Sequence, residues 1–227
     1  DSAIVPSFKI SKKMKELGFR LLLSGCGADE IDNGYSRYSS KIGTIDNKFL
    51  CNLGILISKL APNSFLKNKL FLKLVLYLTG GIGYQANISG CNLAALIKFA
   101  QKDNEEYLFE VLAEIRDSFK LREYRNSNLA KTFTDINNYL PGNLLAIADS
   151  TSMLNSVEIR VPYLDQKLVD IMLINKSKKF KSENKKPHLK ETFSNYLPKI
   201  IFKQVKTGFS INNISNISRS KKIVINL

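Results

Sequence analysis

Hydrophobic positions at helical spacing run through most of the chain, after one short strand-like segment near its start. Lys9–Leu17 carries apolar residues three or four positions apart and is followed by Gly18, which predicts a helix and its end. The apolar run Phe19–Leu23 then predicts a buried strand, and a glycine-rich acidic loop follows it. This order is typical of an α/β unit, in which ligands bind beyond the carboxyl ends of the strands.

After this unit the pattern predicts helices and almost no strands. The predicted helices are Lys48–Leu60, Phe65–Leu78, Leu93–Gln101, Glu105–Leu121, Leu144–Leu154, Gln166–Leu173 and Pro187–Tyr196. Prolines and a glycine cluster separate several of them. Because one strand cannot make a sheet, either further strands escape this pattern or they lie before Asp1.

Charge adds a possible class of partner to this picture. The 227 residues carry a formal net charge of +14. A basic surface attracts nucleic acid, an anionic membrane surface or nucleotide phosphates. The lysines are spread along the chain, however, so a solubilising role is an equal alternative.

Cysteine, histidine and hydropathy exclude several classes of protein. The three cysteines form no CxxC pair, which argues against a disulfide framework or a zinc site and favours a cytoplasmic location. The single histidine, His188, cannot form a multi-histidine metal site. The most apolar stretch, Leu70–Tyr84, contains Lys73 and three glycines, so it is too short and too interrupted to span a bilayer. We expect no membrane partner.

The strongest local motif is Ser24-Gly25-Cys26-Gly27-Ala28-Asp29-Glu30, followed by Asn33-Gly34-Tyr35. Glycines let the backbone turn sharply and approach a ligand, and carboxylates at the end of a strand can hold Mg²⁺ beside phosphates. A strand-to-helix turn whose acids only cap the next helix explains the same residues equally well.

Two further motifs lie downstream. Asp149–Met153 precedes Ser156–Asp165, in which Arg160 can pair with Glu158 or Asp165; a buried structural ion pair is the favoured interpretation. Lys206-Thr207-Gly208-Phe209 places an ammonium beside a glycine turn, where it can contact phosphate oxygens.

Taken in order, these motifs resemble the C-terminal synthetase domain of glutamine-dependent asparagine synthetases. The family pattern is an apolar strand, Ser-Gly-x-Gly-x-Asp-Glu and Gly-Tyr, then Asp with Ser-Met, Glu-x-Arg-Val-Pro-aromatic-Leu-Asp and Lys-x-Gly-Phe. The matching segments are Leu21–Tyr35, Asp149–Asp165 and Lys206–Phe209, with Tyr139-Leu140-Pro141 and Lys186-Pro187 between them. The match covers nearly the whole chain.

The resemblance implies an α/β fold similar to the adenine nucleotide α-hydrolases, followed by a mostly helical region. It implies an ATP-dependent, AMP-forming ligase that adenylates aspartate or a related acid for attack by ammonia. ATP and Mg²⁺ would be the cofactors, and a glutaminase domain that supplies ammonia from glutamine is expected upstream. The nucleotide would contact Ser24, Gly25, Gly27, Asp29 and Glu30, with Asp29 as the Mg²⁺ ligand and Lys206 stabilising charge during adenylation.

On this basis we predict three parts. Residues 1–45 form the end of the nucleotide-binding sheet, residues 46–211 the helical remainder of the synthetase domain, and residues 212–227 an irregular tail. The oligomeric state is left open, and a homodimer is compatible with the resemblance.

Several positions depart from the family. The chain contains neither the upstream Ser-Gly-Gly-x-Asp-Ser pyrophosphate loop nor a glutaminase cysteine, so we expect an N-terminally incomplete fragment that is inactive alone. Cys26 stands where asparagine-forming members commonly have an acid; it is a candidate catalytic residue, although a small residue filling the turn is favoured over a nucleophile. Ser150 and Gln204 replace arginines. The alternatives are an RNA-binding or tRNA-modifying relative and a degenerate, non-catalytic homologue.

Overall fold

The computed structural model describes residues 3–45, 47–100, 104–118, 127–178 and 185–203. These residues divide into two compact units: residues 3–27, 140–165 and 188–203 contribute to unit 1, and the described residues within 28–139 and 166–187 to unit 2. The chain therefore passes between the units within the glycine-rich motif, after Gly27. In the described part of the chain, no helix combines the length and apolarity that crossing a bilayer requires.

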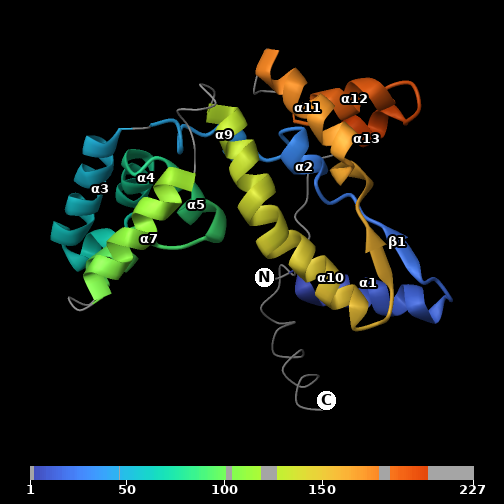
Figure 1. The fold of residues 1–227 in the computed structure, drawn as a ribbon, viewed down its shortest axis with the longest axis horizontal. Helices are drawn as coiled ribbons and strands as arrows, with labels where there is room; N and C mark the ends of the chain where they lie inside the picture. The colour runs from blue at the N-terminus through green and yellow to red at the C-terminus, as the bar shows by residue number, and fades with distance from the viewer. Residues whose placement is uncertain (1–2, 46, 101–103, 119–126, 179–184, 204–227) are drawn as a thin grey trace. The chain divides into compact units, whose positions relative to one another are not determined.

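Unit 1 contains a small parallel sheet and the helices beside it (Figure 1). Its elements are α1 (Ile4–Glu16), β1 (Leu21–Leu23), α10 (Ala146–Met153), β2 (Glu158–Arg160), the 3₁₀ turn η5 (Pro162–Leu164), α12 (Pro187–Phe193, all but its first residue) and α13 (Lys199–Lys203). β1 and β2 run parallel, with Leu21 opposite Glu158 and Leu23 opposite Arg160. α1 and α10 pack together beside the sheet.

A buried polar contact joins α1 to α10. The Asn155 amide donates hydrogen bonds to the Ser11 hydroxyl at 2.9 Å and to the Thr151 carbonyl at 3.2 Å. The Ser11 hydroxyl in turn donates to the Thr151 carbonyl at 2.9 Å, and all three residues are buried. Because buried polar groups need partners, this set holds the two helices in one register.

The prediction that Phe19–Leu23 forms a buried strand is wrong in its burial. The strand is present as β1, but Leu21 and Leu23 are exposed and only Leu22 is partly covered. Among the described residues β1 pairs with β2 alone, so a two-stranded sheet leaves most of its surface open.

Unit 2 is helical. It contains α2 (Ala28–Ile31), the 3₁₀ segments η1 (Ser36–Ser39) and η2 (Asn63–Lys67), α3 (Lys48–Leu60), α4 (Lys69–Leu78), α5 (Gly81–Ser89), α6 (Leu93–Phe99), α7 (Glu105–Ser118), α9 (Ser127–Thr134) and α11 (Gln166–Lys178). The π-helix η4 (Asp135–Leu145) follows α9 and leads into unit 1.

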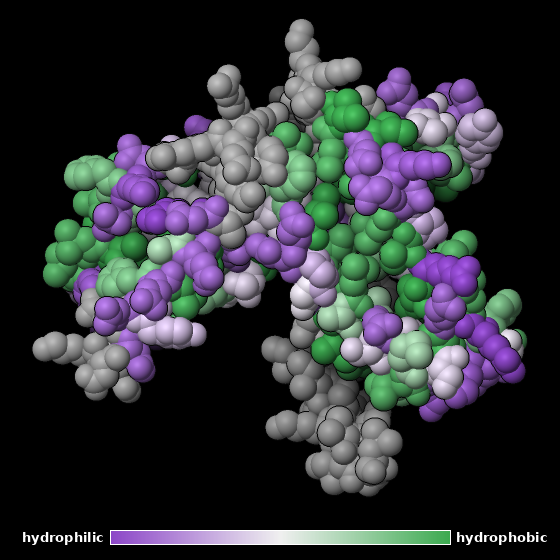
Figure 2. Space-filling model, in the orientation of Figure 1, coloured by the Kyte–Doolittle hydropathy of each residue, from purple (hydrophilic) through white to green (hydrophobic). Residues whose placement is uncertain are grey.

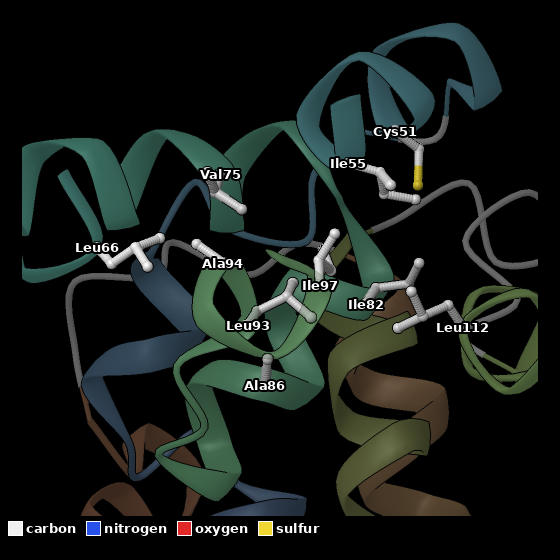
Figure 3. Close-up of a cluster of buried hydrophobic side chains, with 10 residues drawn as sticks. All are labelled: Cys51, Ile55, Leu66, Val75, Ile82, Ala86, Leu93, Ala94, Ile97 and Leu112. Carbon is white, nitrogen blue, oxygen red and sulfur yellow. The ribbon is translucent and has the colours of Figure 1, made fainter. Parts of the chain in front are cut away.

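The main core of unit 2 lies among α3, α4, α5, α6 and α7. Figure 3 shows its buried side chains converging from these helices and from η2: Cys51, Ile55, Leu66, Val75, Ile82, Ala86, Leu93, Ala94, Ile97 and Leu112. Gly54 allows the close approach of α3 to α4, because a Cβ there would lie 3.0 Å from the Cβ of Leu78. Four of these helices, all but α5, are predicted by the helical periodicity of the sequence.

Candidate functional site

In unit 1, the loop after β1 lies beside the loop after β2. The Ser24 amide donates to the Arg160 carbonyl at 2.8 Å, which continues the strand pairing into the glycine-rich motif. Gly27 has a φ of +92°, and a Cβ on it would lie only 2.4 Å from Leu164. The structure therefore brings the glycine motif and the Glu-Ile-Arg-Val-Pro-Tyr-Leu motif together at the carboxyl ends of the two strands, where α/β folds bind ligands.

Ser24 and Cys26 contact each other within this loop. The Ser24 hydroxyl lies 3.1 Å from the Cys26 sulfur as a donor, and the Cys26 amide donates to the same hydroxyl oxygen at 3.2 Å. These contacts close the turn after β1. They are compatible with a cysteine that fills the turn, and they leave its catalytic role a prediction.

In unit 2, the Asp29 carboxylate occupies the first turn of α2 beside Lys186. Asp29 Oδ1 and Lys186 Nζ are 3.2 Å apart, and the Lys186 amide donates to the Asp32 carbonyl at 3.0 Å. Gly34 lies directly under the carboxylate, because a Cβ there would be 1.7 Å from Asp29 Oδ1. Asn33 has a φ of +53°. The Asn-Gly pair thus makes room for the acid, and Lys186 neutralises it.

These residues fit a magnesium ion only as part of its ligand set. The described residues include no group of three or more histidine, cysteine, aspartate or glutamate side chains placed to hold a metal. Asp29 offers one carboxylate, which Lys186 already pairs with. Since Mg²⁺ is commonly held by one or two carboxylates plus substrate phosphates, the further ligands would come from a nucleotide.

Glu30 faces a different partner from Asp29. Its side chain is buried, and the Tyr35 hydroxyl donates to Glu30 Oε1 at 2.8 Å. Burial raises the pKa of the Glu30 carboxyl, while the Tyr35 hydrogen bond opposes the shift. Burial and the adjacent Glu30 carboxylate also raise the pKa of Tyr35. The buried Glu30 carboxyl therefore stabilises the turn through its hydrogen bond with Tyr35. Asp29 is the more exposed acid of the pair.

A buried ionic network on Asp135 lies next to this turn, and the motifs of the sequence do not indicate it. Arg37 donates to Asp135 Oδ2 from Nε at 3.0 Å and from Nη2 at 2.7 Å. Tyr38 donates to the same oxygen at 2.6 Å, and the Tyr84 hydroxyl lies 3.2 Å from both carboxylate oxygens. Burial raises the pKa of the Asp135 carboxyl, while Arg37 and the phenol hydrogen bonds oppose that shift.

Arg37 also connects the network to the acidic turn. Its guanidinium lies 3.7 Å from the centre of the Tyr35 ring and 4.7 Å from that of Tyr139. Such cation–π stacking holds Tyr35, which in turn bonds Glu30. The available sequence signal is Tyr35-Ser36-Arg37-Tyr38, immediately after the Asn-Gly pair: an arginine between aromatic residues.

Lys131 completes the buried charge in this region. Its side chain is fully buried, and Nζ donates to the Ser40 carbonyl at 2.6 Å. Burial lowers the pKa of Lys131 to about 8, against the attraction of Asp135. Nothing in the sequence pattern distinguishes Lys131 from the many exposed lysines.

Of the remaining predicted residues, Arg160 differs from its prediction, and the others lie outside the residues that the structure describes. Arg160 pairs with Glu158 at 2.8 Å, but both side chains are more than half exposed, so the prediction of a buried ion pair is wrong. The open sheet provides no cover for them. Lys206, Gln204 and the tail 212–227 lie outside the described residues.

Comparisons with known proteins agree with the motif order. A family model described as asparagine synthase matches residues 1–223. The chain is also similar to asparagine synthetase (glutamine-hydrolyzing) 1 of Bacillus subtilis (strain 168), with 24% identity over 224 residues that cover 93% of this chain. It spans 33% of the length of that relative. No solved structure matches significantly.

Proposed function

Because this chain belongs to the asparagine synthase family, we propose that it is part of an ATP-dependent, AMP-forming amide ligase. In the proposed reaction, a carboxylate oxygen of aspartate or a related acid attacks the α-phosphorus of ATP and pyrophosphate leaves. Ammonia then attacks the acyl carbon, AMP leaves, and the amide remains. The proposed fold is that of the adenine nucleotide α-hydrolases, with the β1–β2 sheet as part of it.

The observation that carries the proposal is the placement of Asp29. Its carboxylate is seated on Gly34 and neutralised by Lys186 at 3.2 Å, in the turn that directly follows the glycine-rich loop. A paired, partly accessible carboxylate is poised to exchange its partner for a cation that arrives with phosphate. Bound magnesium would neutralise charge on the departing pyrophosphate.

We assign roles to the other candidate residues from their contacts where the structure describes them, and from the family resemblance for Lys206. Ser24, Gly25 and Gly27 are proposed to contact the nucleotide, since they follow β1 at its carboxyl end. Glu30, held by Tyr35, is proposed to keep the acidic turn in place rather than to ligate the metal. Lys206 is proposed to stabilise the charge that develops during adenylation, and Cys26 to fill the turn.

The test is pyrophosphate release by the full-length protein that contains this chain. ATP, Mg²⁺ and aspartate would be supplied with ammonia or glutamine, and asparagine would be measured with AMP. Asp29→Asn should lower the rate about 10²-fold, the scale expected for loss of one electrostatic stabiliser. Asp170→Asn, which changes an exposed acid of α11 bonded to Gln166, is the matched control and should retain the rate.

The outcomes separate the alternatives. Aspartate-dependent release with asparagine formed establishes the proposed reaction. Release with another carboxylate keeps the chemistry and changes the acceptor. Silence with every acceptor identifies a non-catalytic relative instead. Equal, measurable rates for Asp29→Asn and the unaltered protein would refute the role proposed for Asp29.

A further inference from the structure

The strongest feature outside the site is a basic, apolar corner of unit 2. From residue 47 to residue 100 the chain has six lysines and no aspartate, glutamate or arginine. We define the α3–α4 corner as residues 59–70, which comprise the end of α3, η2 and the start of α4. Three large hydrophobic side chains are exposed on it: Leu60 (74%), Phe65 (47%) and Leu70 (78%).

The apolar exposure continues along both helices from this corner. On α3, Phe49, Leu56 and Leu60 are spaced by seven and four residues, which places them on one face, and all three are exposed. On α4, Leu70, Leu74 and Tyr77 form the equivalent stripe. Figure 2 shows hydrophobic residues at the surface over the part of unit 2 where Figure 1 draws α3.

Core packing and hydrogen bonds hold the backbone of the α3–α4 corner in place. Beneath it, Leu66 is buried in the main core (Figure 3). The Asn92 amide donates to the Leu66 carbonyl at 3.0 Å, and Lys98 donates to the Ala61 carbonyl. Asn68 caps α4 by accepting from the Leu70 amide at 2.9 Å. The exposed leucines therefore stand on a fixed scaffold.

Exposed lysines accompany the apolar side chains. Lys67, Lys69 and Lys73 are exposed on η2 and α4, and Lys48 begins α3. On α4, Lys69 and Lys73 lie along one side of the stripe that contains Leu70 and Leu74. No acidic side chain of these helices offsets their charge.

We propose that the α3–α4 corner binds the surface of an anionic lipid bilayer. Apolar side chains flanked by lysines are the pattern of segments that lie in the interface, where the leucines enter the acyl boundary and the lysines meet anionic headgroups. Nucleic acid would use the lysines but not the leucines. The proposal revises the sequence-based expectation that the protein has no membrane partner, and it is independent of the proposed ligase reaction.

The test is sedimentation of the full-length protein with unilamellar vesicles. Vesicles of phosphatidylcholine containing about one-third phosphatidylglycerol would be compared with pure phosphatidylcholine. We expect binding to the anionic vesicles, and at least a tenfold weaker partition for the double variant Leu60→Ser, Leu70→Ser. The matched control is Leu23→Ser, Leu154→Ser, which changes two equally exposed leucines (71% and 74%) of unit 1 and should bind as before.

A charge variant tests whether the lysines of the corner contact the anionic headgroups. Lys67→Gln, Lys69→Gln, Lys73→Gln should lose at least tenfold in partition, whereas Lys9→Gln, Lys12→Gln, Lys15→Gln, the same change of charge on exposed positions of α1, should lose less. Far-ultraviolet circular dichroism checks that each variant folds.

Four results would overturn the proposal. One is no binding to anionic vesicles, and another is binding that the two leucine variants weaken equally. The third is a lipid-free oligomer that only Leu60→Ser, Leu70→Ser dissociates, since that would make the corner an interface between copies. Binding that needs the lysines but not the leucines also counts against it and points to a polyanion such as RNA.

Discussion

The Asp135 network offers the sharpest test of how unit 2 is held together. Asp135→Asn keeps the size of the side chain but removes its charge. The carboxylate is fully buried, and its Arg37 partner is only 14% exposed at 2.7 Å. The substitution therefore leaves a guanidinium nearly enclosed in protein without its counter-ion.

The magnitude follows from this burial. Removing one partner of a buried ion pair costs about 3–5 kcal/mol, because the other charge stays desolvated. The asparagine keeps one oxygen that can accept from Tyr38 or Arg37, so we expect the lower end, about 3 kcal/mol. By contrast, Glu158→Gln breaks a similar arginine–carboxylate contact of 2.8 Å between side chains 57% and 64% exposed. Such exposed pairs contribute about 0–1 kcal/mol.

The assay is urea unfolding followed by circular dichroism, with the free energy of unfolding compared between Asp135→Asn and the Glu158→Gln control. The double change Arg37→Met, Asp135→Asn should cost less than the sum of the single changes, since no charge is then left unpaired. A cost for Asp135→Asn as small as that of the control would refute the reasoning. It would mean that water reaches Arg37 once the carboxylate is gone.

Three further predictions concern single side chains. The folded-state pKa of Lys131, about 8, lies below its unfolded value, so between pH 8 and 10.5 the unfolded chain binds the extra proton. The free energy of unfolding therefore rises with pH in this range by about 1.4 kcal/mol per pH unit from this group. The measurement is the free energy of unfolding in urea as a function of pH, for the unaltered protein minus that for Lys131→Met. A difference that does not change with pH would contradict the prediction. Gly34→Ala should displace the Asp29 carboxylate and lower pyrophosphate release by about 10²-fold, as Asp29→Asn does. Gly142→Ala, which meets open space, should retain the rate; equal rates for the two glycine variants would show that the turn adjusts. Asn155→Ala should lower the free energy of unfolding by about 1–3 kcal/mol, because it removes the two buried hydrogen bonds that the Asn155 amide donates to Ser11 and Thr151. A change below about 0.5 kcal/mol in urea unfolding would show that water replaces the amide.

Helix positions were largely predictable because each helix buries one face at a repeat that the sequence displays. Lys48–Leu60 was predicted and observed with the same bounds, and Phe65–Leu78 resolves into η2 and α4. The break comes at Asn68, whose side chain caps α4. The apolar periodicity predicts one continuous helix here, and the hydrogen bonds of the Asn68 side chain end η2 and start α4 as a separate helix.

Strand β2 was missed for a physical reason. Glu158-Ile159-Arg160 alternates charged and apolar residues over only three positions, too few for a period of two to stand out. Its strand conformation depends on pairing with β1, which is more than 130 residues away in sequence. Only the tertiary structure could supply that partner, and the same open sheet explains why Leu23 and Arg160 are exposed.

By itself, the sequence indicated the family and most of the helices, because spacing and motif order are local properties of the chain. It did not predict α5, α9 or η4, since a glycine cluster and Pro141 suggested breaks there. The residues that it names for the candidate site stay predictions. The tertiary structure decided which charges are buried. It placed Asp29 against Lys186, and it gathered Arg37, Tyr38 and Tyr84 around Asp135 from elements far apart in sequence. The energetic weight of a charge depends on what surrounds it in space, and a linear sequence does not record those surroundings.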